Sequence, residues 1–188
     1  GAKLNRADFQ SDGVVDPAAG TVSFWFRPGA EWEKRNGNFH WFRAGHLALT
    51  LFPDGVNFMT GRTDNGKFRW DYGCGSNRVR NWQPGEWHHV AVTWDRAAKR
   101  KAVWLDGERA KASSTEVFPD AIAPAGEFIF AEFPGEYDEL AVWTRVLAPA
   151  EIARLCGYPE LLPEAFGLTA EPVENMLPVQ RRCRRKLA

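Results

Sequence analysis

The chain has 188 residues, 44% of them hydrophobic and 13% aromatic, which is enough apolar surface for one domain to fold around its own core. Its 24 lysines and arginines balance its 24 aspartates and glutamates, so the sequence lacks the basic excess of a nucleic-acid-binding protein. No stretch is long and apolar enough to cross a bilayer as a helix. Composition therefore predicts one globular domain with no nucleic acid partner and no membrane insertion.

Short segments with apolar residues at every second position dominate the chain, and turn-forming residues close each segment. One face of an extended chain over 21–28 carries Val22, Phe24 and Phe26. The same alternation predicts further strands over 46–52, 56–60, 67–72, 87–94, 101–105, 127–131 and 137–143. This pattern is typical of an all-β antiparallel sandwich or barrel.

One short helix is predicted after the last strand, over 149–156, because Pro149 suits a first helical position and Gly157 suits a stop. Prolines at 159, 163, 172 and 178 interrupt every later candidate element. We therefore expect a folded domain over 1–162. Residues 163–188 are expected to form a linker, a tail or the start of a following domain, and the basic run at 181–186 fits a solvated segment.

The three cysteines, Cys74, Cys156 and Cys183, lie far apart in the sequence. Their spacing indicates neither a disulfide framework nor a metal knuckle. Whether Cys74 and Cys156 meet stays open at this level, and the cysteines do not decide the compartment.

Three ordered motifs resemble a known family. They are Gly-Thr-Val-Ser-Phe-Trp-Phe-Arg-Pro at 20–28, Trp-Gln-Pro-Gly-Glu-Trp-His-His-Val-Ala-Val-Thr-Trp-Asp at 82–95 with Ala-Val-Trp-Leu-Asp-Gly-Glu at 102–108, and Tyr-Asp-Glu-Leu-Ala-Val-Trp-Thr-Arg-Val-Leu at 137–147. Together they resemble the laminin-G-like jelly-roll domains of bacterial extracellular proteins. The resemblance implies a concanavalin A-like β-sandwich and a secreted or extracytoplasmic protein. The chain departs from the family near Leu4, where the usual Phe-Asp-Gly-like turn is missing.

Glucanases share this fold, so the strand around Asp138 is the place to look for a hydrolase site. A retaining glycosidase needs two carboxyl groups about 5 Å apart, which alternate residues of one strand can supply. The position facing Glu136 and Asp138 is Leu140 in regular register, or Ala141 with a bulge. The second carboxylate is therefore missing, and we expect no glycoside hydrolase activity.

Calcium is a candidate cofactor, because several lectins of this kind bind it at a loop edge through carboxylate and carbonyl oxygens. The candidate ligands are Asp8, Asp12, Asp16 and Asp138. The missing turn near the start weakens this prediction, since isolated aspartates in loops also serve as turn formers.

Sugar binding requires exposed aromatic faces beside groups that hydrogen-bond hydroxyls. Two segments combine these features, and their candidate ligand-binding residues are Trp32, His40 and Trp41 in the first, and Trp70, Tyr72 and Asn77 in the second. Each ring could instead hold a loop onto the sandwich, since tryptophan is highly buried on average. The favoured function is a non-catalytic module that binds a glycan or polysaccharide within a larger secreted bacterial protein. The alternatives are a protein-interaction or adhesion module and, behind it, a glycoside hydrolase-like domain.

Overall fold

A computed structural model describes residues 2–4, 7–10, 14–65, 67–114, 118 and 127–157. The strands among these residues are β1 (Ala2–Leu4), β2 (Ala7–Gln10), β3 (Ala19–Pro28), β4 (Phe39–Ala44), β5 (Leu47–Phe52), β6 (Gly55–Asp64), β7 (Lys67–Ser76), β8 (His88–Asp95), β9 (Arg100–Leu105), β10 (Glu108–Ser114), β11 (Glu127–Phe130) and β12 (Gly135–Trp143). Short 3-10 helices are η1 (Ala30–Lys34) and η2 (Arg78–Asn81), and the single α-helix of the described residues is α1 (Pro149–Gly157).

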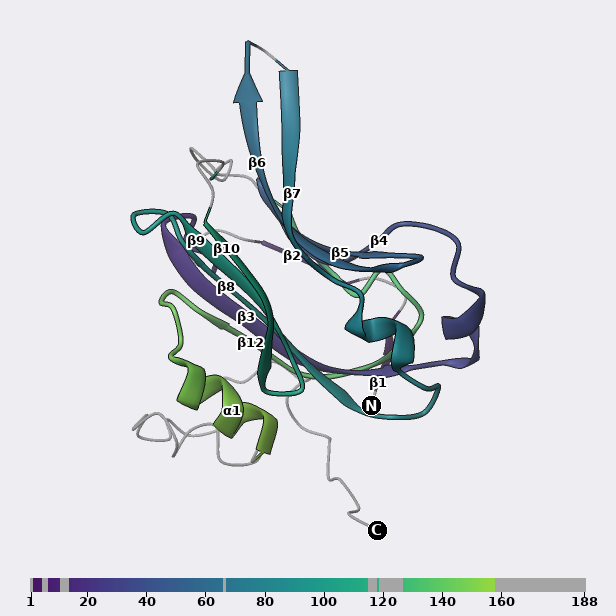
Figure 1. Cartoon of the computed structure of the whole chain (residues 1–188). Helices are drawn as coiled ribbons and strands as arrows, with labels where there is room; N and C mark the ends of the chain where they lie inside the picture. The colour runs from purple at the N-terminus through teal and green to yellow at the C-terminus, as the bar shows by residue number, and fades with distance from the viewer. Residues whose placement is uncertain are drawn as a thin grey trace.

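The strands form two six-stranded antiparallel sheets that lie face to face (Figure 1). Sheet A has the order β1-β12-β3-β8-β9-β10, and sheet B has the order β2-β11-β4-β5-β6-β7. Strand β3 pairs with β12 on one side and β8 on the other, so segments far apart in the sequence become neighbours. The predicted all-β, two-sheet sandwich with one short helix is confirmed. The tip of the β6–β7 hairpin extends beyond the body of the sandwich (Figure 1).

The core lies between the sheets, where the alternating apolar faces meet. Val22, Phe24 and Phe26 of β3 are fully buried, as the alternation predicts. The ring of Phe24 lies 5.1 Å from that of Phe130 in sheet B, and the ring of Phe26 lies 5.2 Å from that of Trp41. Contacts of this kind between aromatic rings join the two sheets.

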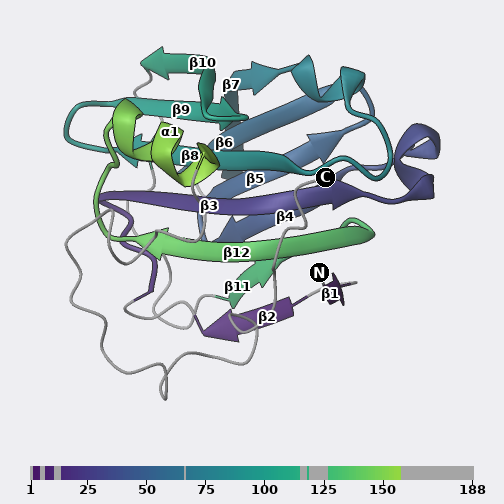
Figure 2. The same cartoon turned by 90° about the horizontal axis from the view of Figure 1, so that it is seen from below.

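Helix α1 covers the outer face of sheet A (Figure 2). It buries Ile152 and Leu155 against Ala91, Ala102 and Trp104 of strands β8 and β9. No described helix packs on the outer face of sheet B. Among the described residues, no helix is both long and apolar enough to span a membrane.

One buried cation links the two sheets. Lys101 of β9 points into the sandwich, is only 2% exposed, and places Nζ 2.7 Å from Asp71 Oδ2 and 3.1 Å from Thr60 Oγ1. Burial lowers the pKa of Lys101, and the hydrogen bond and charge of Asp71 oppose that shift. A buried charge with a carboxylate and a hydroxyl partner holds β9 to the β6–β7 hairpin.

The two described cysteines occupy different sides of sheet A. Cys74 is buried inside the sandwich, with its thiol 3.7 Å from the carbonyl oxygen of Lys101, whereas Cys156 lies on α1 beside Gly107. Cys74 and Cys156 are therefore not bonded to each other. Cys183 and the predicted boundary between 162 and 163 lie outside the described residues.

Candidate functional site

A pocket of about 580 Å³ opens where the β5–β6 turn and the end of β7 approach edge strand β10. The residues that give this pocket its chemistry are Phe52, Asn57, Tyr72, Ser76, Asn77 and Arg78. It is called the Tyr72 pocket below. Two residues from the second predicted aromatic segment, Tyr72 and Asn77, therefore lie at one site.

Two glycines allow the backbones around the Tyr72 pocket to approach closely. A Cβ atom on Gly55 would lie 2.6 Å from the carbonyl oxygen of Ser76. A Cβ atom on Gly75 would lie 2.8 Å from Asn57 Nδ2. The Cβ at Gly55 would meet backbone, so this position of β6 must lack a side chain, whereas a side chain at Gly75 of β7 would displace the amide of Asn57.

A bulge in β7 directs Tyr72 away from the core. Phe58 pairs with Cys74 and Thr60 pairs with Asp71, so Met59 alone lies opposite both Tyr72 and Gly73. The extra residue changes the local register, as β-bulges do. Because Asp71 points inward to Lys101, its neighbour Tyr72 points to the outer face of sheet B, where it is 54% exposed.

The centre of the pocket combines an aromatic wall with a fixed amide. The ring centroids of Tyr72 and Phe52 lie 6.2 Å apart. Asn57 Nδ2 donates to the carbonyl oxygen of Tyr72 at 2.8 Å, which fixes the orientation of the amide. Asn57 Oδ1 has no hydrogen-bond partner among the residues that the structure describes. A buried acceptor without a partner is unusual in a folded protein and marks a place where a ligand hydroxyl would be favourable.

Charged residues at the rim of the pocket are already paired. Arg78 lies 3.2 Å from Glu108 Oε2, and the Arg80 Nε donates to the carbonyl oxygen of Asp54 at 2.7 Å. The rim is therefore close to neutral, while the centre is aromatic and amide-rich. This arrangement suits a neutral, hydroxylated ligand better than an ion.

Burial corrects the prediction for the first aromatic segment. Trp32 and Trp41 are 1% and 0% exposed, and their rings stack 6.4 Å apart, each 6.0 Å from the ring of Trp82. Arg35 covers Trp32 at 4.0 Å. Neither ring offers a face to a sugar, because both complete the core at this end of the sandwich.

The remaining predicted residues lie apart from the Tyr72 pocket. His40 is half-buried, with Nδ1 2.9 Å from Thr50 Oγ1, and burial lowers its pKa. Trp70 lies on the β6–β7 hairpin, where its ring is 4.7 Å from that of Phe68. The sequence prediction missed Phe52 and Asn57, which flank the turn at 53–55 and alternate with core residues. The turn at 53–55 was the sequence signal that could have pointed to Phe52 and Asn57.

Comparison with known proteins places the fold in a family. A sequence model described as the Concanavalin A-like lectin/glucanases superfamily matches residues 4–153. The chain belongs to this superfamily. A search of curated proteins finds no match to this sequence.

Solved structures with the same fold include lectin-like receptor-binding domains. The receptor-binding domain of the botulinum neurotoxin C/D mosaic serotype aligns with a TM-score of 0.61 and 10% identity, over 81% of this chain and 40% of that one. The botulinum neurotoxin serotype D ligand binding domain in complex with N-acetylneuraminic acid aligns with a TM-score of 0.57 and 10% identity, over 74% of this chain and 36% of that one. The heptameric SAP-like pentraxin of Limulus polyphemus aligns with a TM-score of 0.53 and 16% identity, over 74% of this chain and 70% of that one. This superfamily member thus spans less than half of the toxin domains, and these similarities show a shared fold.

Strand β12, which contains Asp138 and is the place to look for paired carboxylates, has a bulge. Asp138 pairs with Trp25 and Ala141 pairs with Ser23, with two residues between them out of register. Asp138 Oδ1 accepts a hydrogen bond from the backbone N of Glu139, which has a positive φ of 50°. Of the two positions considered for a second carboxylate, the bulge selects Ala141, which carries no acid.

The predicted calcium ligands are placed only in part. Asp16 Oδ1 accepts from the backbone N of Ala18 at 2.7 Å, which is a turn-forming role, and Asp138 has the local contact described above. Asp12 and the side chain of Asp8 lie outside the described residues. Within the described part of the chain, no three His, Cys, Asp or Glu side chains are grouped so that they could hold a metal ion.

Proposed function

We propose that this member of the concanavalin A-like superfamily is a non-catalytic carbohydrate-binding module of a larger secreted bacterial protein. The observation that carries the proposal is the Tyr72 pocket, where an exposed aromatic ring stands beside an amide oxygen that has no partner. A pyranose presents an apolar face to an aromatic ring and hydroxyls to amides. The similar neurotoxin domain that is complexed with N-acetylneuraminic acid supports a sugar as the ligand on this fold.

The absence of an acid at Ala141 supports a binding role over hydrolysis, since this strand does not supply the pair of carboxyl groups that the two-carboxylate mechanism needs. Calcium is proposed as an accessory ion through Asp8, Asp12, Asp16 and Asp138, and removal of calcium is the way to test it. Both proposals enter the same binding experiment.

The test is a glycan array and polysaccharide affinity gel on the wild type and on Tyr72→Ala. Truncation of the ring removes the stacking surface, so we expect about a 10-fold loss of affinity for the glycan that binds the wild type. Phe68→Ala is the matched control, because the Phe68 ring lies outside the pocket and is 45% exposed, against 54% for Tyr72. Equal binding by Tyr72→Ala and the wild type would remove the Tyr72 pocket as the sugar site.

The calcium arm repeats each measurement with calcium and with a chelator. If calcium organises the binding site, the chelator weakens binding and lowers the melting temperature of the wild type. Identical affinity and melting temperature under both conditions would refute the calcium proposal without affecting the sugar proposal.

A second candidate function is protein interaction or adhesion, and the β6–β7 hairpin favours it. Phe68 lies over Gly61, where an added Cβ would be 2.4 Å from the Phe68 ring, and the rings of Trp70 and His46 lie 4.7 and 5.1 Å from it. Phe68, which is 45% exposed, and the half-buried Trp70 thus form an aromatic pair on the β6–β7 hairpin, which projects from the sandwich (Figure 1). Loss of a protein ligand in Phe68→Ala, with no glycan bound by the wild type, would favour this function over sugar binding.

A further inference from the structure

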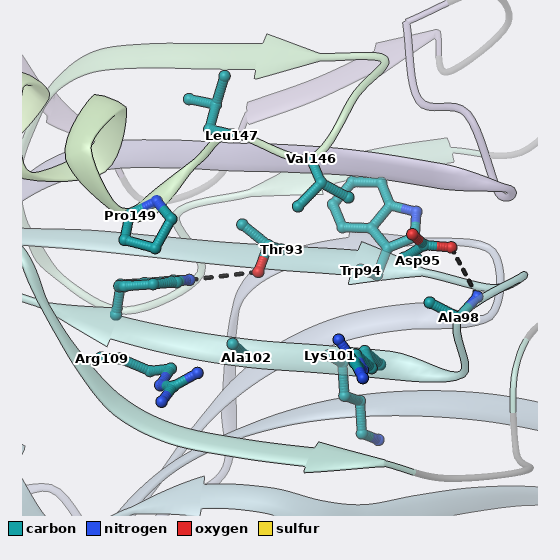
Figure 3. A pocket seen from close by; sticks show the side chains of 12 residues that line it. Thr93, Trp94, Asp95, Ala98, Lys101, Ala102, Arg109, Val146, Leu147 and Pro149 are labelled. Carbon is teal, nitrogen blue, oxygen red and sulfur yellow. Dashed lines mark hydrogen bonds between the residues drawn. The ribbon is translucent and has the colours of Figure 1, made fainter.

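A second pocket, of about 490 Å³, lies on the other side of strand β10, between α1 and the outer face of sheet A (Figure 3). It is called the arginine groove below. Its floor is formed by strands β8 and β9, and one wall is the segment Val146 to Pro149 that leads into α1. In Figure 3, Arg109 and Ala102 lie on the opposite side of the groove from Val146 and Leu147. No residue of the Tyr72 pocket lines it.

Two exposed arginines line this groove without partners. Among the residues that the structure describes, no hydrogen bond or ion pair engages the guanidinium group of Arg100 or of Arg109. By contrast, Arg78 and Asp54, which line the Tyr72 pocket, are paired with Glu108 and Arg80. Five guanidinium donors on each arginine thus remain available to an anionic ligand.

The two arginines stand at opposite ends of an apolar floor. Arg109 pairs with Trp104, which is four residues along β9 from Arg100, so about 13 Å of strand separates the two positions. Ala102 lies between them. The polar atom of Trp104 is already used, because its Nε1 donates to Thr93 Oγ1 at 3.2 Å. The floor therefore presents hydrocarbon, and Val146, which is 39% exposed, adds an apolar wall.

A carboxylate near one arginine gives the groove an acceptor as well. Asp95 is directly opposite Arg100 in the β8–β9 ladder and lines the groove. One of its oxygens, Oδ1, accepts from the backbone N of Ala98 at 2.9 Å, as Figure 3 shows. The two arginines can thus bind acid groups of a ligand, and Asp95 can accept a hydrogen bond from a ligand hydroxyl. The apolar floor between them can contact the face of a sugar ring.

We infer that the arginine groove binds acidic sugar residues of a polysaccharide. A ligand for this groove must carry negative charge at more than one point along its length, have hydroxyl donors and offer an apolar ring face. A chain of uronic acid residues has all three properties. The inference rests on the proposed function, because it makes the ligand a glycan, and it adds that this glycan is acidic.

The position of the groove also relates it to the Tyr72 pocket. Arg109 lines the groove, and the next residue, Ala110, lines the Tyr72 pocket. Ala110 is the extra residue of a β-bulge in β10, because Arg109 and Lys111 pair with two consecutive residues of β9. A polysaccharide that passes around edge strand β10 would therefore meet both sites in succession.

The experiment measures binding of a galacturonic acid oligomer and of its methyl ester by calorimetry. The two probes have the same rings, but the ester lacks the negative charges. We compare the wild type with Arg100→Gln/Arg109→Gln. The control is Arg62→Gln/Arg69→Gln, which makes the same change in net charge at two exposed arginines that pair across the β6–β7 hairpin.

We expect the wild type to bind the acid oligomer at least about 10-fold more tightly than the ester, and the groove variant to lose about 10-fold in affinity for the acid. The hairpin variant should stay within about twofold of the wild type, because its charges lie away from the groove. Added salt should weaken binding of the acid oligomer more than binding of the ester. Thermal unfolding of each variant checks that it is folded.

Three results would overturn the inference. Equal affinity for acid and ester means that the charge is not recognised, and equal losses in both double variants mean that only net charge attracts the ligand. Failure of the wild type to bind the acid oligomer also refutes it. In each case a neutral glycan that binds the wild type and is lost in Tyr72→Ala would leave the proposed function intact.

Discussion

His89 should make the stability of this protein depend strongly on pH. Its side chain, on β8, is 1% exposed and lies against the ring of Trp25, with the ring centroids 5.4 Å apart. No described residue forms a hydrogen bond with either ring nitrogen, so a charged imidazole would be buried without a hydrogen-bond partner in this part of the structure. Burial lowers the pKa of His89 to about 4, and the nearby carboxylate of Asp106 offsets the effect only in part.

The magnitude follows from the two protonation equilibria. The unfolded chain protonates His89 at its ordinary pKa of 6.5, whereas the folded chain does so only near 4. Between these pH values the unfolded state binds more protons, so the free energy of unfolding falls as pH falls. The difference amounts to about 3 kcal/mol, since one pKa unit is worth about 1.4 kcal/mol. The contribution of neutral His89 is fully present above pH 6.5 and is lost by about pH 4.

The assay is urea unfolding of the wild type and of His89→Leu at several pH values between about 7.5 and 4. Leucine has a similar size, needs no hydrogen bond and cannot be protonated. We expect the wild type to lose about 3 kcal/mol more than the variant over this range, because all other titrating groups are common to both proteins. Parallel pH profiles for the two proteins would refute the assignment of a buried neutral imidazole at His89.

Two further predictions concern buried contacts. Asp71→Ala leaves the Lys101 ammonium buried without its carboxylate and should lower the free energy of unfolding by about 3 kcal/mol. Lys101→Met removes the buried charge and should change the free energy of unfolding by less than about 1.5 kcal/mol. Equal losses for the two variants in chemical denaturation would contradict a buried ion pair. Gly20→Ala would place a Cβ 2.3 Å from the ring of the buried Trp94 and should cost about 2 kcal/mol. Gly29→Ala is the control, because nothing lies within 4 Å of its added Cβ, and thermal unfolding that does not separate the two alanine variants would count against this packing.

Eight of the twelve strands among the described residues could be predicted from the sequence because local patterns determine them, whereas β1, β2, β4 and β10 were missed. Val22, Phe24 and Phe26 alternate with polar positions, and period-two alternation has few structural solutions besides a half-buried strand. The helix over 149–157 was likewise indicated by Pro149 and Gly157, which act within their own turns. The resemblance carried by the family motifs further predicted that the strands combine into two sheets.

The candidate site was predicted only in part, because exposure of an aromatic ring depends on distant residues. Trp41 and Tyr72 both lie at β-bulges, yet Trp41 is covered by Trp32 and Trp82, while Tyr72 lies exposed on the outer face of sheet B. A bulge inserts one residue into a ladder and reverses the face of those beyond it. The sequence does not mark that position in advance.

The sequence by itself determined a small all-β domain, eight of its strand segments, its neutral overall charge and the lack of an acid at Leu140 and Ala141, the two positions that could face Asp138. These are properties of composition and of neighbouring residues. Only the tertiary structure decided that Tyr72 and Asn57 share a pocket, that Lys101 is buried against Asp71, and that Arg100 and Arg109 stand unpaired over one floor. Each of these depends on which strands become neighbours and on which side of a sheet α1 lies, and these are long-range outcomes of packing that local pattern does not specify.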